Sequence, residues 1–154
     1  MPVSYTHLRA HETSLHLVCR LLLEKKNLQA RAEVSAPIVR AIHEKLNANK
    51  IFLAAVQPKR ITGTMINRYD QGMFYGKHND APEMNGIRTD FSFTLFLSPP
   101  EDYDGGELVI YADCEASKIK LPAGKMVLYP TRFVHEVTEV TRGTRIAAVG
   151  WVES

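Results

Sequence analysis

The sequence predicts a mainly β fold with an N-terminal helix, and among the all-β architectures it favours a jelly roll over other sandwiches and barrels. The 154 residues are 45% hydrophobic and 23% charged, which is typical of a single soluble globular domain. From Arg60 onward, seven short apolar runs are separated by turn residues. No helical pattern of crossover length separates these runs, so a parallel βαβ fold is disfavoured.

The clearest helix spans Ser35 to Asn49. Ser35 is the candidate N-cap, and Pro37 lies in the first turn, where a missing backbone N–H is tolerated. Asn47 and Asn49 are the candidate terminators. The apolar face recurs at four-residue spacing, at Ile38, Ile42 and Leu46.

The strand predictions follow from the apolar runs and the turns between them. The runs are Ile61–Tyr69, Phe91–Leu97, Glu107–Tyr111, Lys118–Leu121, Met126–Tyr129, Val134–Val140 and Thr144–Val152. Gly105 and Gly106 allow a tight connection where a Cβ would clash. Pro122 and Gly124 form a turn, and Pro130 ends the strand that follows it. Apolar residues of the second run alternate with Ser92 and Thr94 and are expected in the core: Phe91, Phe93, Leu95 and Leu97.

Composition argues against several classes of protein. Nineteen Lys and Arg against 17 Asp and Glu leave a net charge of +2, too small to indicate a nucleic-acid or membrane surface. No stretch of 18 apolar residues exists, and the leucine-rich segment Leu15–Leu23 lacks a signal-peptide cleavage site. Cys19 and Cys114 lie far apart, which is more typical of reduced cytosolic thiols than of a disulfide framework. We therefore predict a cytoplasmic protein without nucleic-acid or membrane partners.

Two histidines and one aspartate are the candidate metal ligands. His78 and Asp80 form an H-x-D pair, and residues i and i+2 of extended backbone point to the same face. His135 lies near the start of another β run, which a sandwich can bring opposite the pair. Two imidazoles and one carboxylate make the facial triad of non-haem Fe(II) oxygenases. An H-x-D pair alone arises often by chance, so a surface or core role for His135, and equally for His43, stays open.

Arg145 is the candidate anion-binding residue. Strand alternation places Ala147, Val149 and Trp151 on its face, and the opposite face is apolar as well. We therefore expect the guanidinium to be buried, where a charge is strongly disfavoured without a partner. A ligand carboxylate held in bidentate fashion would supply that partner. An ion pair with a distant aspartate or glutamate is the alternative.

Three long segments together resemble a known family. They are NRYDQGMFYGKHNDAPEM, RTDFSFTLFLSPPEDYDGGELVIY and KLPAGKMVLYPTRFVHEVTEVTRGTRIAAVGWVES. In order and spacing they resemble the PKHD-type hydroxylases, bacterial Fe(II)/2-oxoglutarate-dependent dioxygenases of the prolyl-4-hydroxylase-like superfamily. The resemblance runs from about Lys26 to the end of the chain. It implies a double-stranded β-helix of the jelly-roll type, in agreement with the fold class above.

The resemblance also implies an activity and its residues. His78, Asp80 and His135 would be the Fe(II) ligands, and Arg145 would hold the distal carboxylate of 2-oxoglutarate. Tyr69 matches the family's R-Y and would line the co-substrate pocket, with a packed strand aromatic as the alternative. The implied reaction uses O2 to convert 2-oxoglutarate to succinate and CO2 while hydroxylating a substrate, with L-ascorbate as an iron-reducing helper. Neither the small-molecule or peptide substrate nor the oligomeric state is indicated.

The resemblance divides the chain into an atypical leader (1–25), an N-terminal helical region (26–58) and the dioxygenase domain (59–154). The string MPVSYTHLRAHET resembles translated read-through of a sequencing adapter, so the native origin of the leader stays open. The family has a different N-terminal helix and strand and continues beyond WVES into a largely helical segment, so we expect a chain truncated at both ends. A non-catalytic jelly-roll module that binds a metal or ligand, or an inactive fragment, remains an alternative.

Overall fold

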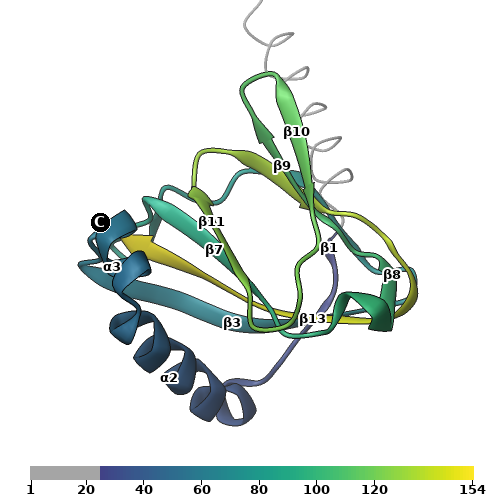
Figure 1. The fold of residues 1–154 in the computed structure, drawn as a ribbon, viewed down its shortest axis with the longest axis horizontal. Coiled ribbons are helices and arrows are strands. Elements are labelled where there is room, and N and C mark those ends of the chain that lie inside the picture. The colour runs from purple at the N-terminus through teal and green to yellow at the C-terminus, as the bar shows by residue number, and fades with distance from the viewer. Residues whose placement is uncertain (1–24) are drawn as a thin grey trace, which may run out of the picture.

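The computed structural model describes residues 25–154 and contains two facing β sheets, with helices α2 (Ala32–Ala48) and α3 (Lys50–Val56) packed on one of them (Figure 1). A short 3-10 helix spans Pro100–Asp102. The strands in chain order are β1 (Lys25–Lys26), β2 (Leu28–Gln29), β3 (Arg60–Asp70), β4 (Phe74–His78), β5 (Glu83–Met84), β6 (Ile87–Arg88), β7 (Phe91–Phe96), β8 (Tyr103–Gly105), β9 (Leu108–Ala112), β10 (Glu115–Ile119), β11 (Met126–Pro130), β12 (Val134–Val137) and β13 (Val140–Glu153).

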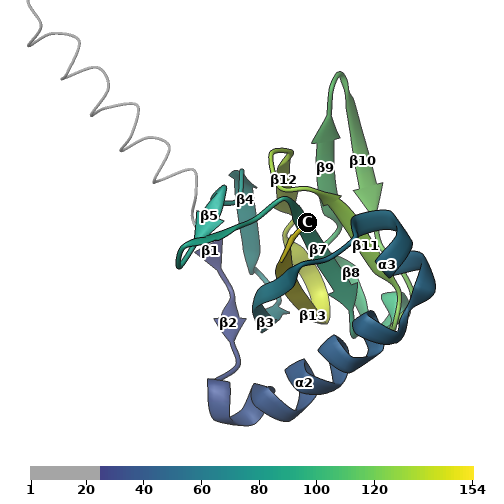
Figure 2. The ribbon, with the colours of Figure 1, turned by 90° about the vertical axis from the view of Figure 1, so that its left-hand side faces the viewer.

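The two sheets have the interleaved strand order of a jelly roll. The major sheet runs β11-β7-β13-β3-β2, with β8 paired to one end of β13. The minor sheet runs β1-β4-β12-β9-β10, and its β9–β10 hairpin extends away from the rest of the fold (Figures 1 and 2). Strands adjacent in a sheet are antiparallel and mostly distant in sequence. This arrangement, a double-stranded β-helix preceded by helix, confirms the predicted fold class.

The N-terminal helix begins earlier than the sequence predicted. α2 starts after Arg31, and Ser35 lies inside it with its hydroxyl donating to the Ala32 carbonyl at 3.5 Å. The predicted N-cap role of Ser35 is therefore wrong. Of the three residues before it, Ala32 and Glu33 are good helix formers, and the acidic Glu33 is favourable in the first turn, so the helix extends back to Ala32 at little cost. Ile38, expected on the apolar face, is 47% exposed.

Asn49 separates the two helices. It ends α2 with extended backbone, as predicted, and its side-chain oxygen accepts a hydrogen bond from the Phe52 N–H at 3.0 Å. An asparagine in this position is a strong N-cap, because it satisfies a backbone donor that the first turn leaves free. The sequence analysis did not identify α3 as a separate helix. Within residues 25–154, no helix combines the length and apolar character needed to cross a membrane.

The helices pack on the outer face of the major sheet. The predicted core face of β7 is confirmed there, since Phe93 is fully buried and Ser92 and Thr94 point instead into the space between the sheets. Alternation along β13 is likewise as predicted. The buried residues of this core come from both helices and three central strands: Ile42, Leu46, Phe52, Val56, Ile66, Phe93, Ala148 and Val152.

Each of the seven predicted runs overlaps a strand, but the boundaries of three differ by more than one residue, including β13, which begins at Val140 and not at Thr144. β10 begins at Glu115 and ends at Ile119, earlier than predicted, and the run from Val134 is broken after Val137. Strand β4 was not predicted at all. Its sequence, FYGKH, is short and contains a glycine, so periodicity gives no signal, although this strand carries His78.

Two glycines at the predicted strand connections differ in how crowded their surroundings are. Gly105 and Gly124 both have left-handed backbone, with φ of +69° and +83°. A Cβ on Gly105 would lie 2.0 Å from the Glu139 carbonyl oxygen, whereas a Cβ on Gly124 would meet nothing within 4 Å. Gly124→Ala should cost about 1–2 kcal/mol of unfolding free energy from backbone strain alone. Gly105→Ala should cost about 1–3 kcal/mol more, from the clash. Urea unfolding measures both, and equal losses would contradict the argument.

Candidate metal centre

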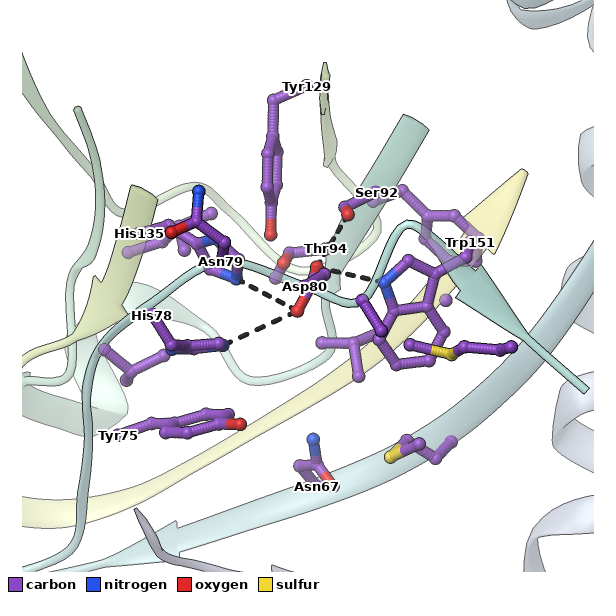
Figure 3. Close-up of a pocket in the computed structure, with 18 of the residues that line it drawn as sticks. Asn67, Tyr75, His78, Asn79, Asp80, Ser92, Thr94, Tyr129, His135 and Trp151 are labelled. Atoms are coloured by element: carbon purple, nitrogen blue, oxygen red, sulfur yellow. Dashed lines mark hydrogen bonds and ion pairs between the residues drawn. The ribbon is translucent and has the colours of Figure 1, made fainter. Parts of the chain in front are cut away.

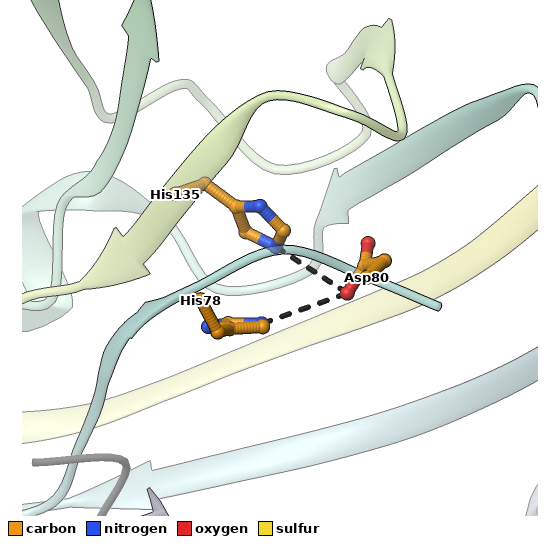
Figure 4. A group of neighbouring side chains, drawn as sticks. All are labelled: His78, Asp80 and His135. Atoms are coloured by element: carbon orange, nitrogen blue, oxygen red, sulfur yellow. Dashed lines mark ion pairs between the residues drawn. The ribbon is translucent and has the colours of Figure 1, made fainter. Parts of the chain in front are cut away.

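Strand register brings the two candidate histidines together. β4 and β12 are antiparallel neighbours, and His78 is the direct register partner of His135. Asp80 follows two residues after His78, beyond the end of β4. The donor atoms of all three side chains lie within 4.8 Å of one another (Figure 4). The structure therefore places the three predicted site residues around one point.

A single oxygen of Asp80 faces both imidazoles. Its Oδ1 lies 3.5 Å from His78 Nε2 and 3.6 Å from His135 Nε2. The two rings are 4.2 Å apart between centroids and tilted by 53°. All three side chains are at most 10% exposed, so water screens them poorly.

Backbone carbonyls determine which nitrogen of each ring faces Asp80. His78 Nδ1 lies 2.8 Å from the Gly76 carbonyl oxygen, and His135 Nδ1 lies 3.1 Å from that of Phe133. A carbonyl can only accept, so each Nδ1 donates and each neutral ring presents the lone pair of Nε2. Two lone pairs and a carboxylate oxygen thus converge, an arrangement that a cation would stabilise.

The protonation states suit such a cation. Burial raises the pKa of Asp80, but the neighbouring imidazoles and the Ser92 and Trp151 donors outweigh burial and lower that pKa to about 2. Burial lowers the pKa of His135. Metal ligation requires an ionised carboxylate, and the low pKa of Asp80 means that this carboxylate carries no proton that a metal would have to displace near neutral pH.

A cavity of roughly 230 Å³ opens between the sheets at this point (Figure 3). The cavity is lined by all five predicted site residues: His78, Asp80, His135, Arg145 and Tyr69. Its polar groups come from both sheets, and the remaining wall is largely apolar. The apolar residues include Met65, Leu108, Val137 and Val149.

Arg145 is buried without an acidic partner. It is 1% exposed, and its Nε and Nη2 have no hydrogen-bond partner among the residues that the structure describes. Its Cζ lies 5.1 Å from the ring centre of Tyr69 and 5.5 Å from that of Phe96. Burial lowers the pKa of the guanidinium. Among the ion pairs found within residues 25–154, none includes Arg145, so the alternative of an internal ion pair is not realised there.

Tyr69 lies beside Arg145 on the neighbouring strand, where the two are register partners. It is 2% exposed, and its hydroxyl accepts a hydrogen bond from Asn27 Nδ2 at 2.9 Å. Its ring lies in a small aromatic and aliphatic cluster that includes Tyr103 and Val140. Tyr69 is therefore both a packed aromatic and part of the cavity wall.

Sequence reasoning missed several residues of this site. Ser92 and Trp151 hydrogen-bond to Asp80, and Tyr75 stacks on His78 with ring centres 3.7 Å apart. Two polar residues on the inner face of an otherwise apolar strand were a usable signal for Ser92. Tyr75 had none, because β4 itself was not predicted.

The other candidates lie elsewhere. His43 in α2 has its Nε2 2.8 Å from Thr64 Oγ1 and is a packing histidine of the helix–sheet interface. Cys114 is exposed and has a free thiol. Cys19 and the leader lie outside the described residues.

Comparison with known proteins agrees with this geometry. A PKHD-type hydroxylase from Picosynechococcus sp. is 42% identical over 135 residues, which cover 88% of this chain and 62% of the relative. One from Parvibaculum lavamentivorans is 46% identical over 131 residues, 84% of this chain and 60% of the relative. The crystal structure of a Pseudomonas putida prolyl-4-hydroxylase, 25% identical, matches with a TM-score of 0.55 over 82% of this chain and 69% of that one.

The chain thus spans 62% and 60% of the length of these two curated relatives. The family model for the 2OG-Fe(II) oxygenase superfamily matches residues 64–153, more than half of the chain. That range includes His78, Asp80 and His135, and also Arg145 and Tyr69. With the jelly roll, the converging ligand atoms and this match, the chain belongs to the 2OG-Fe(II) oxygenase superfamily.

Proposed function

We propose that the chain binds Fe(II) through His78, Asp80 and His135 and binds 2-oxoglutarate in the same cavity, anchored by Arg145. The observation that carries this proposal is a buried guanidinium with two unpartnered donors, in the cavity where two imidazole nitrogens and one carboxylate oxygen meet. The cavity has one site for a cation and one for an anion.

The donor set fits ferrous iron. Neutral imidazole and carboxylate are ligands that suit iron, and three protein ligands on one side leave positions for other molecules. Among residues 25–154 no cysteine lines the cavity, so the thiolates typical of structural zinc sites are not found in the described part of its wall.

Arg145 fits a carboxylate at the far end of a co-substrate. Two charge-assisted hydrogen bonds from Nε and Nη2 would satisfy donors that are otherwise buried and unpaired. The anion would also offset the cost of burying the positive charge. Tyr69 lies next to this anchor and would border the bound dicarboxylate.

The proposed reaction is the oxidative decarboxylation of 2-oxoglutarate to succinate and CO2 with O2, coupled to hydroxylation of an unidentified small-molecule or peptide substrate. Iron and 2-oxoglutarate supply the oxidising chemistry when bound, and the protein supplies orientation and a water-poor wall. L-ascorbate would serve as an iron-reducing helper. Succinate should therefore form slowly even without the substrate.

We also propose a cytoplasmic location and no nucleic-acid or membrane partner. The free thiol of Cys114 and the net charge of +2 support this proposal.

Anaerobic addition of Fe(II) and then 2-oxoglutarate tests the proposal. The chelated complex should give a weak visible charge-transfer band, and air should then yield succinate. Zn(II) in place of Fe(II) is the control and should give neither signal. A melting temperature that rises when metal is added, together with no succinate formation, would favour a non-catalytic binding module instead. Absence of metal binding would refute the proposal.

A further inference from the structure

We infer that Trp151 and Ser92 are positioning residues that determine which oxygen of Asp80 faces the two imidazoles. The inference rests on the proposed metal site and assigns a role to two side chains that contact Asp80 only through Oδ2, the oxygen that does not face the imidazoles. It concerns how the carboxylate is held, and it can be tested without measuring turnover.

The two oxygens of Asp80 have separate partners. Oδ2 accepts a hydrogen bond from Ser92 Oγ at 2.6 Å and another from Trp151 Nε1 at 2.9 Å (Figure 3). Oδ1 is the oxygen that lies near both Nε2 atoms. The major sheet therefore engages one oxygen and leaves the other for the point where the imidazoles of the minor sheet converge.

Asp80 needs such a restraint because its backbone lies outside any strand. Its neighbour Asn79 donates to the Arg132 carbonyl at 2.6 Å, which holds the loop but not the carboxylate. The last torsion of an aspartate side chain has a broad energy well. Without donors to Oδ2, the carboxylate is free to turn and to present both oxygens.

The two donors are themselves fixed by the sheet. Ser92 in β7 and Trp151 in β13 are direct register partners, so their side chains emerge side by side on the inner face. They are 2% and 7% exposed. Ser92 Oγ also lies 3.1 Å from Thr131 Oγ1, which further restricts its rotation.

A local irregularity of the neighbouring strand makes room for the indole. The pairing of β13 with β3 shifts between Val149 and Trp151, next to Gly63, whose φ is +63°. A Cβ on Gly63 would lie 2.8 Å from Trp151 Cε3. Glycine at this bulge thus lets the ring approach the backbone of β3 closely while its N–H donates to Asp80.

The functional consequence is a carboxylate that offers one oxygen to the metal. A one-oxygen ligand leaves more of the coordination sphere for other molecules than a two-oxygen ligand does. Outer hydrogen-bond partners of metal ligands typically contribute 10–100-fold to metal affinity. Trp151 is also the single tryptophan of the chain, so its fluorescence reports directly on the neighbourhood of Asp80.

The test measures Co(II) binding to the full chain without 2-oxoglutarate. Trp151→Phe keeps an aromatic ring but removes the donor, and Ser92→Ala removes the other donor. Competition with a chromogenic chelator should show affinity lowered by roughly 10–100-fold in each variant. The visible Co(II) absorption bands should also change, because a freed carboxylate alters the ligand geometry. In wild type and in Ser92→Ala, the quenching of Trp151 emission by Co(II) should give, for each protein, the same affinity as the chelator competition gives for that protein.

Matched controls remove similar groups from the minor sheet. Tyr111→Phe removes a hydroxyl that donates to Glu136, and Ser117→Ala removes an exposed hydroxyl on β10. Both variants should bind Co(II) as the wild type does. Wild-type affinity and absorption bands in both Trp151→Phe and Ser92→Ala would overturn the inference while leaving the metal site intact. Failure of the wild-type chain to bind Co(II) would instead refute the proposed function. If Trp151→Phe does not fold, judged by circular dichroism, Ser92→Ala decides the matter.

Discussion

Replacing His78 with alanine should abolish the Fe(II)-dependent conversion of 2-oxoglutarate to succinate. Loss of an outer-shell partner typically weakens a metal site 10–100-fold, so loss of a ligand itself should weaken it by more than roughly 100-fold. His78 presents Nε2 to the shared point, and its register partner His135 cannot replace that nitrogen. Fe(II) affinity and succinate yield measure the effect together.

His43→Ala is the matched control for this prediction. His43 hydrogen-bonds to Thr64 in the helix–sheet interface and lies outside the cavity wall. The control should bind Fe(II) and form succinate like the wild type, with a small loss of stability at most. Equal succinate yields from wild type and His78→Ala would mean that the iron is held elsewhere.

Arg145→Met should weaken 2-oxoglutarate binding strongly without destabilising the ligand-free protein. Two charge-assisted hydrogen bonds of at least about 1.5 kcal/mol each would be lost, which is roughly 100-fold in affinity. The ligand-free wild type buries an unpaired guanidinium, and an apolar side chain of similar volume removes that cost. Anaerobic titration calorimetry with Co(II) present measures affinity, and thermal melting measures stability.

Arg142→Met separates this effect from a general loss of positive charge. Arg142 lies on the same strand, is exposed, and pairs with Asp104 at 2.6 Å. Its replacement should leave 2-oxoglutarate affinity unchanged, because exposed pairs contribute little. Unchanged affinity in Arg145→Met would reject the anchor role, and a large fall in its melting temperature would show that the guanidinium has an internal partner.

The shared face of Arg145 and its neighbours was predictable from local alternation. In a strand, each second side chain points the same way, so a charge among apolar residues on both faces must be buried. The same rule identified Phe93 as core and left Ser92 on the inner face. The H-x-D spacing placed His78 and Asp80 together for the same reason.

The helix start and strand β4 were not predictable with the same rules. Ser35 is a good N-cap by residue type, yet three helix-compatible residues before it extend α2. β4 owes its extended form to its neighbours β1 and β12, since FYGKH has too little periodicity to be recognised by itself.

The sequence alone determined the fold class, from the series of short apolar runs and turns, and the candidate ligands, from residue type and motif. It also determined the burial of Arg145, from alternation along one strand. Tertiary structure alone decided that His135 lies opposite His78, that no described acid reaches Arg145, and that Trp151 and Ser92 share one oxygen of Asp80. These contacts depend on strand register and on how two sheets face each other. Local periodicity shows which face of a strand is buried, and so excludes a one-residue slip, but it does not show which strands pair or which residues lie opposite each other on strands distant in sequence.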